Sequence, residues 1–494
     1  MRSALLCALI CGFPAWADPV FEDRSDALPS HVYGGGWNFF VGGGVAVFDC
    51  NGDALPDAFL AGGENPAKLV VNQGNFQFET APVGNLTQVT GAYPLDIDGD
   101  GVLDLFVMRA GANLALRGQG NCVFKDATAQ WGLPEDDAWT TAFTAWWPDG
   151  AARPTMAVGN YVDRDNPDGP FEACDTNAVL TPMDDGYVST PLSPGFCPLS
   201  MLAARDARGR NGLRLSNDRH YYVKGGYEQI WDIEEQRFLD MTDGWPRVSL
   251  WGMGVASRDL TGDGRDEVIL TSMGDQLMQI AQNDGTYTSA PFSIGTYAQR
   301  PHVGGDGRPS TGWHAEFADV DNDARADLFI AKGNVDQMPG MATKDPNNLL
   351  MQQPDGTFRE ASIEAGVASF HRSRGGALAD FDLDGRLDLI VVNRRAPAEL
   401  YRNVTADVGN WLRVVPKMLS RNRDAIGAVV TVVTPESTQS IQRVVGGGHA
   451  GGQLLPMHFG LADAQTAQVR VEWPDGQQTS AKAVAGQTLV IRKP

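Results

Sequence analysis

The sequence has few basic residues, few cysteines and few histidines for its length. Its 494 residues include 39 Lys and Arg against 61 Asp and Glu, with 6 Cys and 7 His, so the formal net charge is -22 at pH 7. A protein that follows nucleic-acid phosphates needs a basic stripe, so this balance excludes that class of partner. The sequence also lacks H-E-x-x-H, G-x-S-x-G, C-x-x-C and P-loop motifs, so no familiar catalytic motif indicates a reaction.

Long apolar runs are also absent after the N-terminus. Residues 1–17 combine Arg2, the apolar stretch 4–13 and an Ala15-Trp16-Ala17 cleavage pattern, which is typical of a secretory signal peptide. No later stretch approaches the ~18 apolar residues of a membrane helix. We therefore expect a mature chain that starts at Asp18, is secreted or periplasmic, and has no membrane span.

Glycine is abundant, and the chain is built from repeats. Five Asp-rich nonapeptides start at residues 49, 96, 259, 319 and 380, each between two short apolar strands, and a third strand and an F-x-[DE] strand follow several of them. Two eroded copies, at residues 147–155 and 204–212, keep the same frame. Seven four-stranded units at near-even spacing predict an all-β fold, a seven-bladed β-propeller, because radial closure leaves few strand edges exposed.

The ends of the repeat region predict how the ring closes. The last unit lacks its own F-x-[DE] strand, and residues 21–25 match the missing strand. We therefore expect a propeller over residues 18–409, in which residues 18–30 complete the last blade and residues 160–203 form an irregular insertion in blade 3. A small β domain rich in Val and Gly is expected over residues 410–494.

The Asp-rich loops predict calcium sites. The spacing D-x-[DN]-x-D-G-x-x-D places oxygen ligands at positions 1, 3, 5 and 9, and Ca²⁺ accepts six to eight oxygen ligands at ~2.3–2.6 Å. A metal-free Asp-rich turn is the alternative, but five copies in frame favour metal because clustered carboxylates repel each other without a cation. The predicted ligands of about five sites are Asp49, Asn51, Asp53 and Asp57; Asp96, Asp98, Asp100 and Asp104; Asp259, Thr261, Asp263 and Glu267; Asp319, Asp321, Asp323 and Asp327; and Asp380, Asp382, Asp384 and Asp388.

These loops resemble the FG-GAP/VCBS repeats of integrin-α-type propellers. The C-terminal sequence also resembles the ASPIC/UnbV domain, in the motifs at residues 422–428, 445–449, 458–461 and 469–476. Together they are similar to the cartilage acidic protein family, which has many bacterial members. The resemblance implies a secreted calcium-binding propeller with a C-terminal β module and implies no established chemistry. The eroded loops at Trp147 and Ala204 depart from the pattern, and we assign them no metal.

A glycine-rich segment near the C-terminus fits the dinucleotide fingerprint G-x-G-x-x-G over residues 446–451. That fingerprint must open a helix, and residues 453–456 (Gln-Leu-Leu-Pro) cannot do so. We therefore predict a tight turn here and no nucleotide cofactor.

Four cysteines remain after the expected cleavage. An even number in an oxidising compartment predicts two disulfides. Cys50 and Cys122 fall in loops on the predicted calcium face, and Cys174 and Cys197 fall in loops on the opposite face. Pairing across the faces would have to span a strand of ~17 Å, beyond the ~7 Å limit between Cα atoms, so we predict Cys50–Cys122 and Cys174–Cys197.

The face opposite the calcium loops is the predicted ligand face. Its candidate residues are Trp37, Trp139, Trp251, Trp313, His314, His371 and Arg374. Aromatic residues near a propeller axis often pack between blades, which is the alternative for these side chains, whereas exposed ones bind ligands. We predict an exported calcium-binding propeller that binds an extracellular or periplasmic protein or glycan, with no catalytic residues assigned. A glycan lyase or hydrolase that uses the His and Arg residues of this face is the alternative.

Overall fold

A computed structural model describes residues 18–167, 173–218, 225–297 and 308–494, so the predicted signal peptide lies outside the described residues. Seven four-stranded antiparallel sheets form the blades of a propeller, which confirms the predicted fold. The first strands of successive blades contact each other, and the first strand of blade 7 contacts that of blade 1. These contacts close the ring.

The strands follow the predicted frame, in which each sheet is one blade and its strands run outward in chain order, except that β1 is the outermost strand of blade 7. Blades 1 to 4 comprise β2 (Val45–Phe48), β3 (Asp57–Leu60), β4 (Lys68–Asn72) and β5 (Phe78–Ala81); β6 (Val89–Leu95), β7 (Asp104–Arg109), β8 (Leu114–Gly118) and β9 (Phe124–Asp126); β10 (Thr140–Trp146), β11 (Thr155–Asn160), β12 (Asn177–Met183) and β13 (Gly186–Leu192); and β14 (Pro198–Arg205), β15 (Asn211–Asn217), β16 (Gln229–Asp232) and β17 (Arg237–Phe238). Blades 5 to 7 comprise β18 (Gly252–Arg258), β19 (Glu267–Ser272), β20 (Leu277–Ala281) and β21 (Tyr287–Ser289); β22 (Gly312–Ala318), β23 (Asp327–Lys332), β24 (Asn348–Gln352) and β25 (Phe358–Glu360); and β26 (Arg372–Ala379), β27 (Asp388–Arg394), β28 (Glu399–Asn403) and β1 (Phe21–Asp23). Short helical turns connect some strands: η1 (Ser25–Ala27), η2 (Trp37–Phe39), η3 (Met241–Asp243), η4 (Phe292–Ile294) and α2 (Ser362–Ala365).

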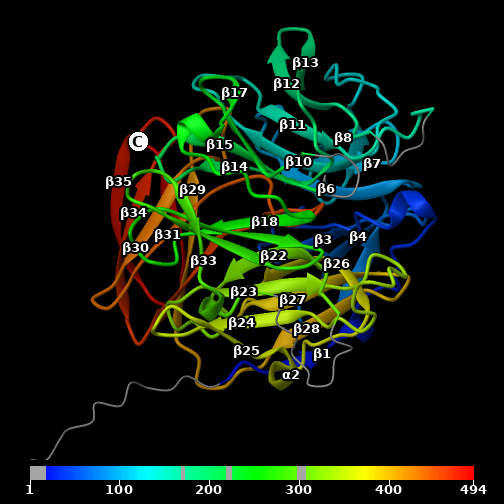
Figure 1. Ribbon diagram of the computed structural model, residues 1–494. Helices are drawn as coiled ribbons and strands as arrows, with labels where there is room; N and C mark the ends of the chain where they lie inside the picture. The colour runs from blue at the N-terminus through cyan, green and yellow to red at the C-terminus, as the bar shows by residue number, and fades with distance from the viewer. Residues whose placement is uncertain (1–17, 168–172, 219–224, 298–307) are drawn as a thin grey trace, which may run out of the picture.

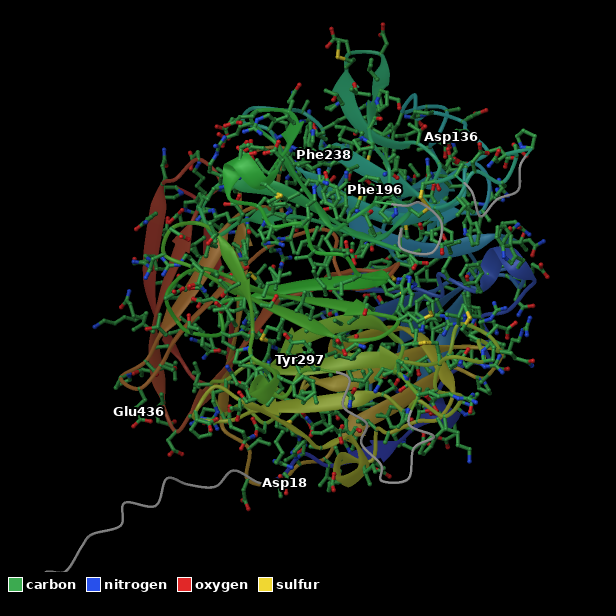
Figure 2. The ribbon with its side chains drawn as sticks, in the orientation of Figure 1. Asp18, Asp136, Phe196, Phe238, Tyr297 and Glu436 are labelled. Carbon is green, nitrogen blue, oxygen red and sulfur yellow. A yellow bond between two sulfur atoms is a disulfide. The ribbon has the colours of Figure 1, made fainter. Side chains whose placement is uncertain are left out.

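Burial falls from the axis outward. All seven residues of β6 are buried, whereas the outer strand β9 of the same blade has no buried residue. Inner strands are covered on both faces by neighbouring blades, which explains their continuous apolar runs. Side chains fill the space between the ribbons (Figure 2), and the core divides into clusters that lie between blades.

The N-terminal strand closes blade 7 as predicted. β1 pairs antiparallel with β28, with Phe21 opposite Asn403. The segment 160–203 is not irregular throughout, because within it β12 and β13 form the two outer strands of blade 3 and β14 begins at Pro198. Polar residues and prolines in this hairpin hid its strand pattern, since its outer strand is largely exposed.

The C-terminal region forms a second β unit beside the propeller (Figure 1). One sheet has the order β33 (Met457–Ala462), β29 (Asn410–Lys417) and β36 (Gln487–Arg492), and the other has the order β31 (Thr438–Gln442), β30 (Val429–Val433), β34 (Thr466–Glu472) and β35 (Gln478–Val484). Leu412, Val430, Phe459 and Trp473 lie in the core between them. We call residues 410–494 the C-terminal unit.

The glycine-rich segment is not a tight turn. Residues 445–454, which we call the axial segment, leave the C-terminal unit and contact the inner strands of blades 1 to 5. Within it, β32 (Gln453–Leu454) pairs in parallel with β2 and adds a fifth strand to blade 1. Because inner strands surround the axis of a propeller, this segment occupies the central channel.

Glycine makes this close approach possible. A Cβ atom on Gly451 would lie 2.1 Å from the carbonyl oxygen of Val45, and one on Gly91 of blade 2 would lie 1.7 Å from that of Ala450. Gly446 and Gly447 also have φ of 123° and 80°, a region that side chains disfavour.

Candidate metal centres

Three of the five predicted loops bring their carboxylates together. The groups are Asp96, Asp98 and Asp104; Asp319, Asp321 and Asp327; and Asp380, Asp382 and Asp388, and within each group one oxygen per residue lies within 4.8 Å of the others. Each loop joins the first two strands of its blade. These residues are the predicted ligands at positions 1, 3 and 9.

The position 1 and position 9 carboxylates also build the loop. Asp96 accepts hydrogen bonds from the backbone N–H groups of Asp100 and Gly101. Asp104 accepts from Ile97 at 2.7 Å and from Gly118, at the end of the third strand, at 2.8 Å. Asp388 repeats this pattern in blade 7. These two positions therefore shape the loop and attach it to the blade, whether or not a cation is bound.

The carboxylates at position 3 have a different environment from those at positions 1 and 9. In blade 7, Oδ1 of Asp382 is buried without a hydrogen-bond partner, while Oδ2 lies 2.6 Å from Nη2 of Arg402. In blade 2, Asp98 pairs in the same way with Arg117 at 2.9 Å. An arginine on the third strand therefore faces each of these two carboxylates.

The position 5 carboxylates do not belong to these groups. Asp100 accepts from the backbone N–H of Val102 and pairs with Arg117 at 2.8 Å. Asp323 and Asp384 instead pair with the arginine two residues further along the chain. The structure therefore does not bring the predicted position 5 ligands into the three groups.

Burial makes the grouped carboxylates costly to ionise without a cation. It raises the pKa of Asp104 to about 8 and that of Asp380 to about 6, and it raises the pKa of Asp319 and Asp388 well above the usual range. Nearby carboxylates add to the effect at Asp319. Buried charges need a partner, and a bound cation would supply one to each group.

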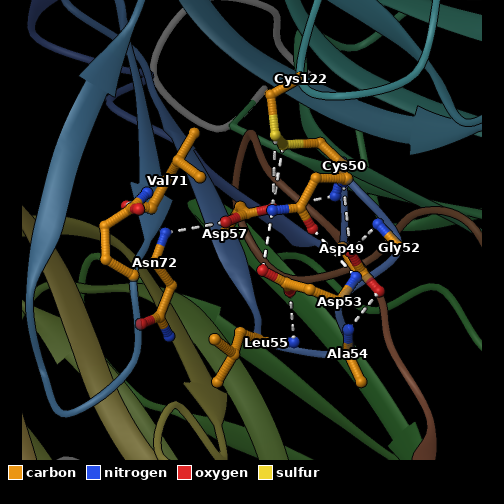
Figure 3. Close-up of a disulfide and its surroundings, with 12 residues drawn as sticks. Asp49, Cys50, Gly52, Asp53, Ala54, Leu55, Asp57, Val71, Asn72 and Cys122 are labelled. Atoms are coloured by element: carbon orange, nitrogen blue, oxygen red, sulfur yellow. Dashed lines mark hydrogen bonds between the residues drawn. A yellow bond between two sulfur atoms is a disulfide. The ribbon is translucent and has the colours of Figure 1, made fainter.

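Two predicted sites differ from the other three. Among the residues that the structure describes, the carboxylates of the loops at Asp49 and Asp259 do not form such a group. In the first, Asp57 accepts from the N–H groups of Cys50 and Asn72, and the Cys50–Cys122 disulfide lies beside it (Figure 3). In the second, Glu267 is 1% exposed and its Oε1 has no hydrogen-bond partner.

Both predicted disulfides are present. Cys50–Cys122 joins the calcium-type loop of blade 1 to the outer hairpin of blade 2, and Cys174–Cys197 joins blade 3 to the start of blade 4, with Cα atoms 4.7 and 5.0 Å apart. Two disulfides indicate folding in an oxidising compartment. Within the described part of the chain, no helix has the length and apolar character needed to cross a membrane.

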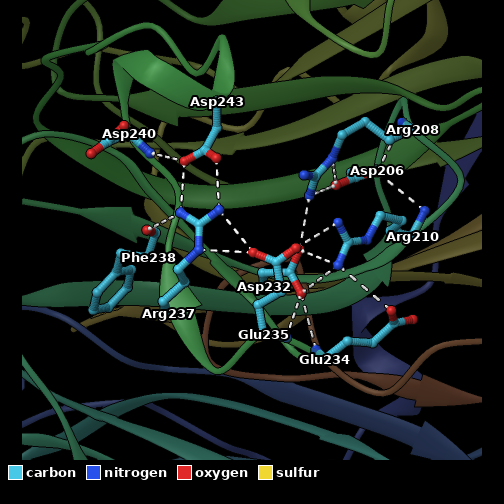
Figure 4. Close-up of polar contacts among 10 residues, drawn as sticks. All are labelled: Asp206, Arg208, Arg210, Asp232, Glu234, Glu235, Arg237, Phe238, Asp240 and Asp243. Atoms are coloured by element: carbon cyan, nitrogen blue, oxygen red, sulfur yellow. Dashed lines mark hydrogen bonds and ion pairs between the residues drawn. The ribbon is translucent and has the colours of Figure 1, made fainter.

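The eroded loop of blade 4 contains guanidinium groups where other blades have carboxylates. Arg208 pairs with Asp206 at 2.6 Å and with Asp232 at 3.3 Å, and Arg210 pairs with Asp232 at 3.1 Å (Figure 4). Arg210 also pairs with Glu235. This network connects the inner loop of the blade to its outer hairpin.

The C-terminal unit covers the calcium-type loops. The N–H of Ala462 donates to the carbonyl oxygen of Asn322 at 2.9 Å, and Nε of Arg423 donates to that of Gly99 at 2.9 Å. Trp411 lies so close to Gly385 that a Cβ there would be 1.8 Å from the indole nitrogen. The loop face therefore forms the interface between the two parts of the chain.

The predicted ligand face is only partly exposed. Trp139, Trp313 and Arg374 are fully buried and His314 is 5% exposed; Trp251 is partly buried, and Trp37 and His371 are exposed. The buried side chains pack between blades and against the axial segment, as the alternative interpretation held. Their polar sequence neighbours suggested exposure, but the axial segment and the loops around Phe39 and Asn334 cover them.

These side chains also do not form one site. Trp37 contacts Trp139 with ring centroids 4.9 Å apart, while Arg374 lies 4.0 Å over the ring of Trp313. His371 pairs with Glu399 at 3.7 Å.

Two known families match three segments of the chain. The FG-GAP-like repeat matches residues 49–107 and 259–330, and the ASPIC and UnbV family matches residues 418–494. The chain is 30% identical over 174 residues to cartilage acidic protein 1 of Homo sapiens and 28% identical over 174 residues to that of Xenopus tropicalis. Each match covers 34% of this chain and 26% of the relative, so the match spans about a quarter of the length of these relatives.

Solved structures with a similar arrangement include BBS1N in complex with ARL6DN and YCF48 bound to D1 peptide. The first is 10% identical with a TM-score of 0.46 and covers 79% of this chain and 98% of that chain. The second is 9% identical with a TM-score of 0.45 and covers 80% of this chain and 99% of that chain.

Proposed function

Because the chain contains FG-GAP-like repeats and a C-terminal ASPIC and UnbV domain, we propose that it is an exported calcium-binding propeller that acts as a protein- or glycan-binding module. The observation that supports calcium binding is the set of three carboxylate groups at equivalent places in blades 2, 6 and 7. All donors are hard oxygens, which Ca²⁺ prefers and which suit zinc or copper less well.

Calcium would act mainly on stability. A metal that binds only the folded protein at ~100 times its dissociation constant adds ~2.7 kcal/mol per site. Three such sites would rival the ~5–15 kcal/mol net stability of a typical domain. The loops also contact the C-terminal unit, so calcium would hold the interface as well as the blades.

Calorimetric titration of Ca²⁺ into EDTA-stripped protein tests this role. We expect at least three sites, and Asp382→Asn should remove one of them. Asp284→Asn is the matched control, since Asp284 lies in an exposed hairpin turn and bonds only to Thr286. The proposal would be contradicted if Asp382→Asn bound as many calcium ions as the native chain, or if the native chain gave no heat of calcium binding.

The open face of the propeller is the proposed binding surface. The C-terminal unit covers the other face, and Trp37 is 39% exposed on η2. Trp139 and Phe40 hold its ring at centroid distances of 4.9 and 6.1 Å. An aromatic ring held in place by its neighbours loses little conformational entropy on binding, which favours contact with a protein or glycan.

A glycan array and a pull-down from the medium or periplasm, each with calcium, test the binding role. Trp37→Ala should reduce binding to any hit without changing the melting temperature. Val433→Ala is the control, because Val433 has the same 39% exposure on the C-terminal unit. Equal loss in both variants would exclude Trp37 as the contact.

A further inference from the structure

A cavity of about 280 Å³ lies between the propeller and the C-terminal unit. The inner strands of blades 5, 6 and 7 line one side, and the axial segment with the start of β33 lines the other. Val255, Phe317, Leu378 and Leu454 make much of the wall apolar. The axial segment therefore leaves part of the central channel unfilled on the side of blades 5 to 7.

Arg258, the last residue of β18, lines this cavity. It is 6% exposed, and the carboxylates of Asp266, Asp319 and Asp259 stabilise its charge. Its guanidinium carbon lies 6.0 Å from the centroid of the Phe459 ring. A buried guanidinium also needs hydrogen-bond acceptors, and the cavity gives Arg258 room for one.

Arg413, on β29, lines the same cavity from the C-terminal unit. Its Nε is buried without a hydrogen-bond partner, and its Nη1 lies 3.5 Å from Asp380. Both arginines act on His458, because burial together with the charges of Arg413 and Arg258 lowers the pKa of that imidazole to about 3. The two guanidinium groups therefore line one cavity together with His458.

The acidic residues of the cavity are already engaged. Glu316 accepts from Gln453 at 2.7 Å and from the N–H of Leu378 at 3.1 Å. Asp380 accepts from the N–H groups of its own loop. Glu316 and Asp380 therefore already have donors, whereas Nε of Arg413 has none of its hydrogen-bonding capacity used.

We propose that this cavity binds a small organic carboxylate, with its head between Arg258 and Arg413 and an apolar body against Val255, Phe317 and Leu454. Guanidinium donors match a carboxylate with two parallel hydrogen bonds. The volume is near the lower end of the ~300–1,000 Å³ range of ligand pockets, which favours a ligand with one ring or a short branched chain.

A groove provides a route to this site. A larger hollow of about 1050 Å³ lies between the loops of blades 5 and 6 and residues 434–439 of the C-terminal unit, and it also reaches Arg258. A ligand can therefore approach Arg258 along the interface without separating the two parts of the chain.

Titration calorimetry with benzoate tests the site, with benzamide as the neutral probe of the same shape. We expect benzoate to bind at least about tenfold more tightly than benzamide, as a charge-assisted pair predicts. Arg258→Gln and Arg413→Gln should each weaken benzoate binding by about tenfold or more. Arg237→Gln is the control, since Arg237 lies outside the cavity and pairs with Asp243 on blade 4.

Each titration is made in EDTA and again in calcium, so the result does not depend on the proposed metal sites. Equal affinity for benzoate and benzamide, or no benzoate heat up to about 10 mM in either buffer, would overturn the proposal. An equal loss in Arg237→Gln would overturn it too. Crystals of the native chain soaked in 4-iodobenzoate need no variant: an iodine anomalous peak in the cavity supports the site, and a peak only elsewhere, or none, refutes it.

Discussion

One imidazole at the centre of the propeller holds the axial segment in place. Nε2 of His449 accepts from the N–H of Gly42 at 3.2 Å, which leaves Nδ1 as the donor toward the carbonyl oxygen of Met253 at 3.4 Å. The backbone N–H of His449 donates to Nδ1 of His314, so the proton of His314 is on Nε2, toward Glu316. The contact with Gly42 requires the neutral form of the His449 ring, because a protonated Nε2 cannot accept a hydrogen bond.

Acid should therefore loosen the axial segment. Burial, together with the charge of Arg374, lowers the pKa of His449 to about 3. The unfolded chain takes up a proton near pH ~6.5 and the folded chain does not. The stabilising contribution is thus complete above about pH 6.5 and is lost as the pH falls toward 3, by up to ~1.4 kcal/mol per pH unit.

Urea unfolding between pH 7 and 4 measures this effect. As the pH falls, the free energy of unfolding of the native chain should decrease more steeply than that of His449→Gln. The variant lacks the imidazole that takes up a proton on unfolding. His371→Gln is the control because His371 is exposed, and its slope should match that of the native chain. Parallel curves for the native chain and His449→Gln would contradict the role of His449.

At the scale of elements, the blades connect their inner loop to their outer strands by different chemistry. Blades 2, 6 and 7 use carboxylates that cluster at one place, and blade 4 uses the arginines around Asp232. A disulfide beside the loop of blade 1 performs a similar role between blades 1 and 2. Stability should therefore respond to calcium in some blades and not in others.

Arg208→Gln should destabilise the protein by the same amount with calcium and with EDTA. Asp206 and Asp232 are buried and would each lose a charge-assisted hydrogen bond, a change of ~1–3 kcal/mol. Urea unfolding in calcium and in EDTA measures this loss of unfolding free energy. Asp382→Asn serves as the contrast, since its effect should appear mainly in calcium. A calcium-dependent loss in Arg208→Gln would indicate that blade 4 binds metal after all.

At the scale of the whole molecule, the propeller and the C-terminal unit share their cores. Val445 and Leu454 pack into the cluster that contains Tyr93 and Phe143 of blades 2 and 3. β32 pairs with β2 across more than four hundred residues of sequence. Neither part therefore has a complete interior without the other.

Calorimetric unfolding of the mature chain should then give one transition. The expressed fragments 18–409 and 410–494 should each be much less stable, and the first should aggregate because inner strands lose their axial contacts. Thermal scans of the chain and of both fragments measure this. Two resolved transitions in the full chain, or a propeller fragment that melts like it, would show that the axial segment contributes little.

Local patterns in the sequence determined the blades, their number, the closing strand and the disulfides. Each of these depends on residues within one repeat, or on the face to which a loop belongs, so spacing alone was sufficient. The positions of the carboxylate groups in blades 2, 6 and 7 follow in the same way, because one nonapeptide turn brings positions 1, 3 and 9 together.

Only the tertiary structure decided what lies at the axis and between the two units. Gly44 and Gly91 meet Ala450, Trp313 packs on His449, and Arg258 and Arg413 line one cavity. Each of these contacts joins segments that are far apart in the chain, so the spacing of residues within one repeat cannot predict them. The sequence shows Gly44 and Gly91, but the reason for glycine there is the close approach of the Ala450 backbone, which only the folded chain brings about.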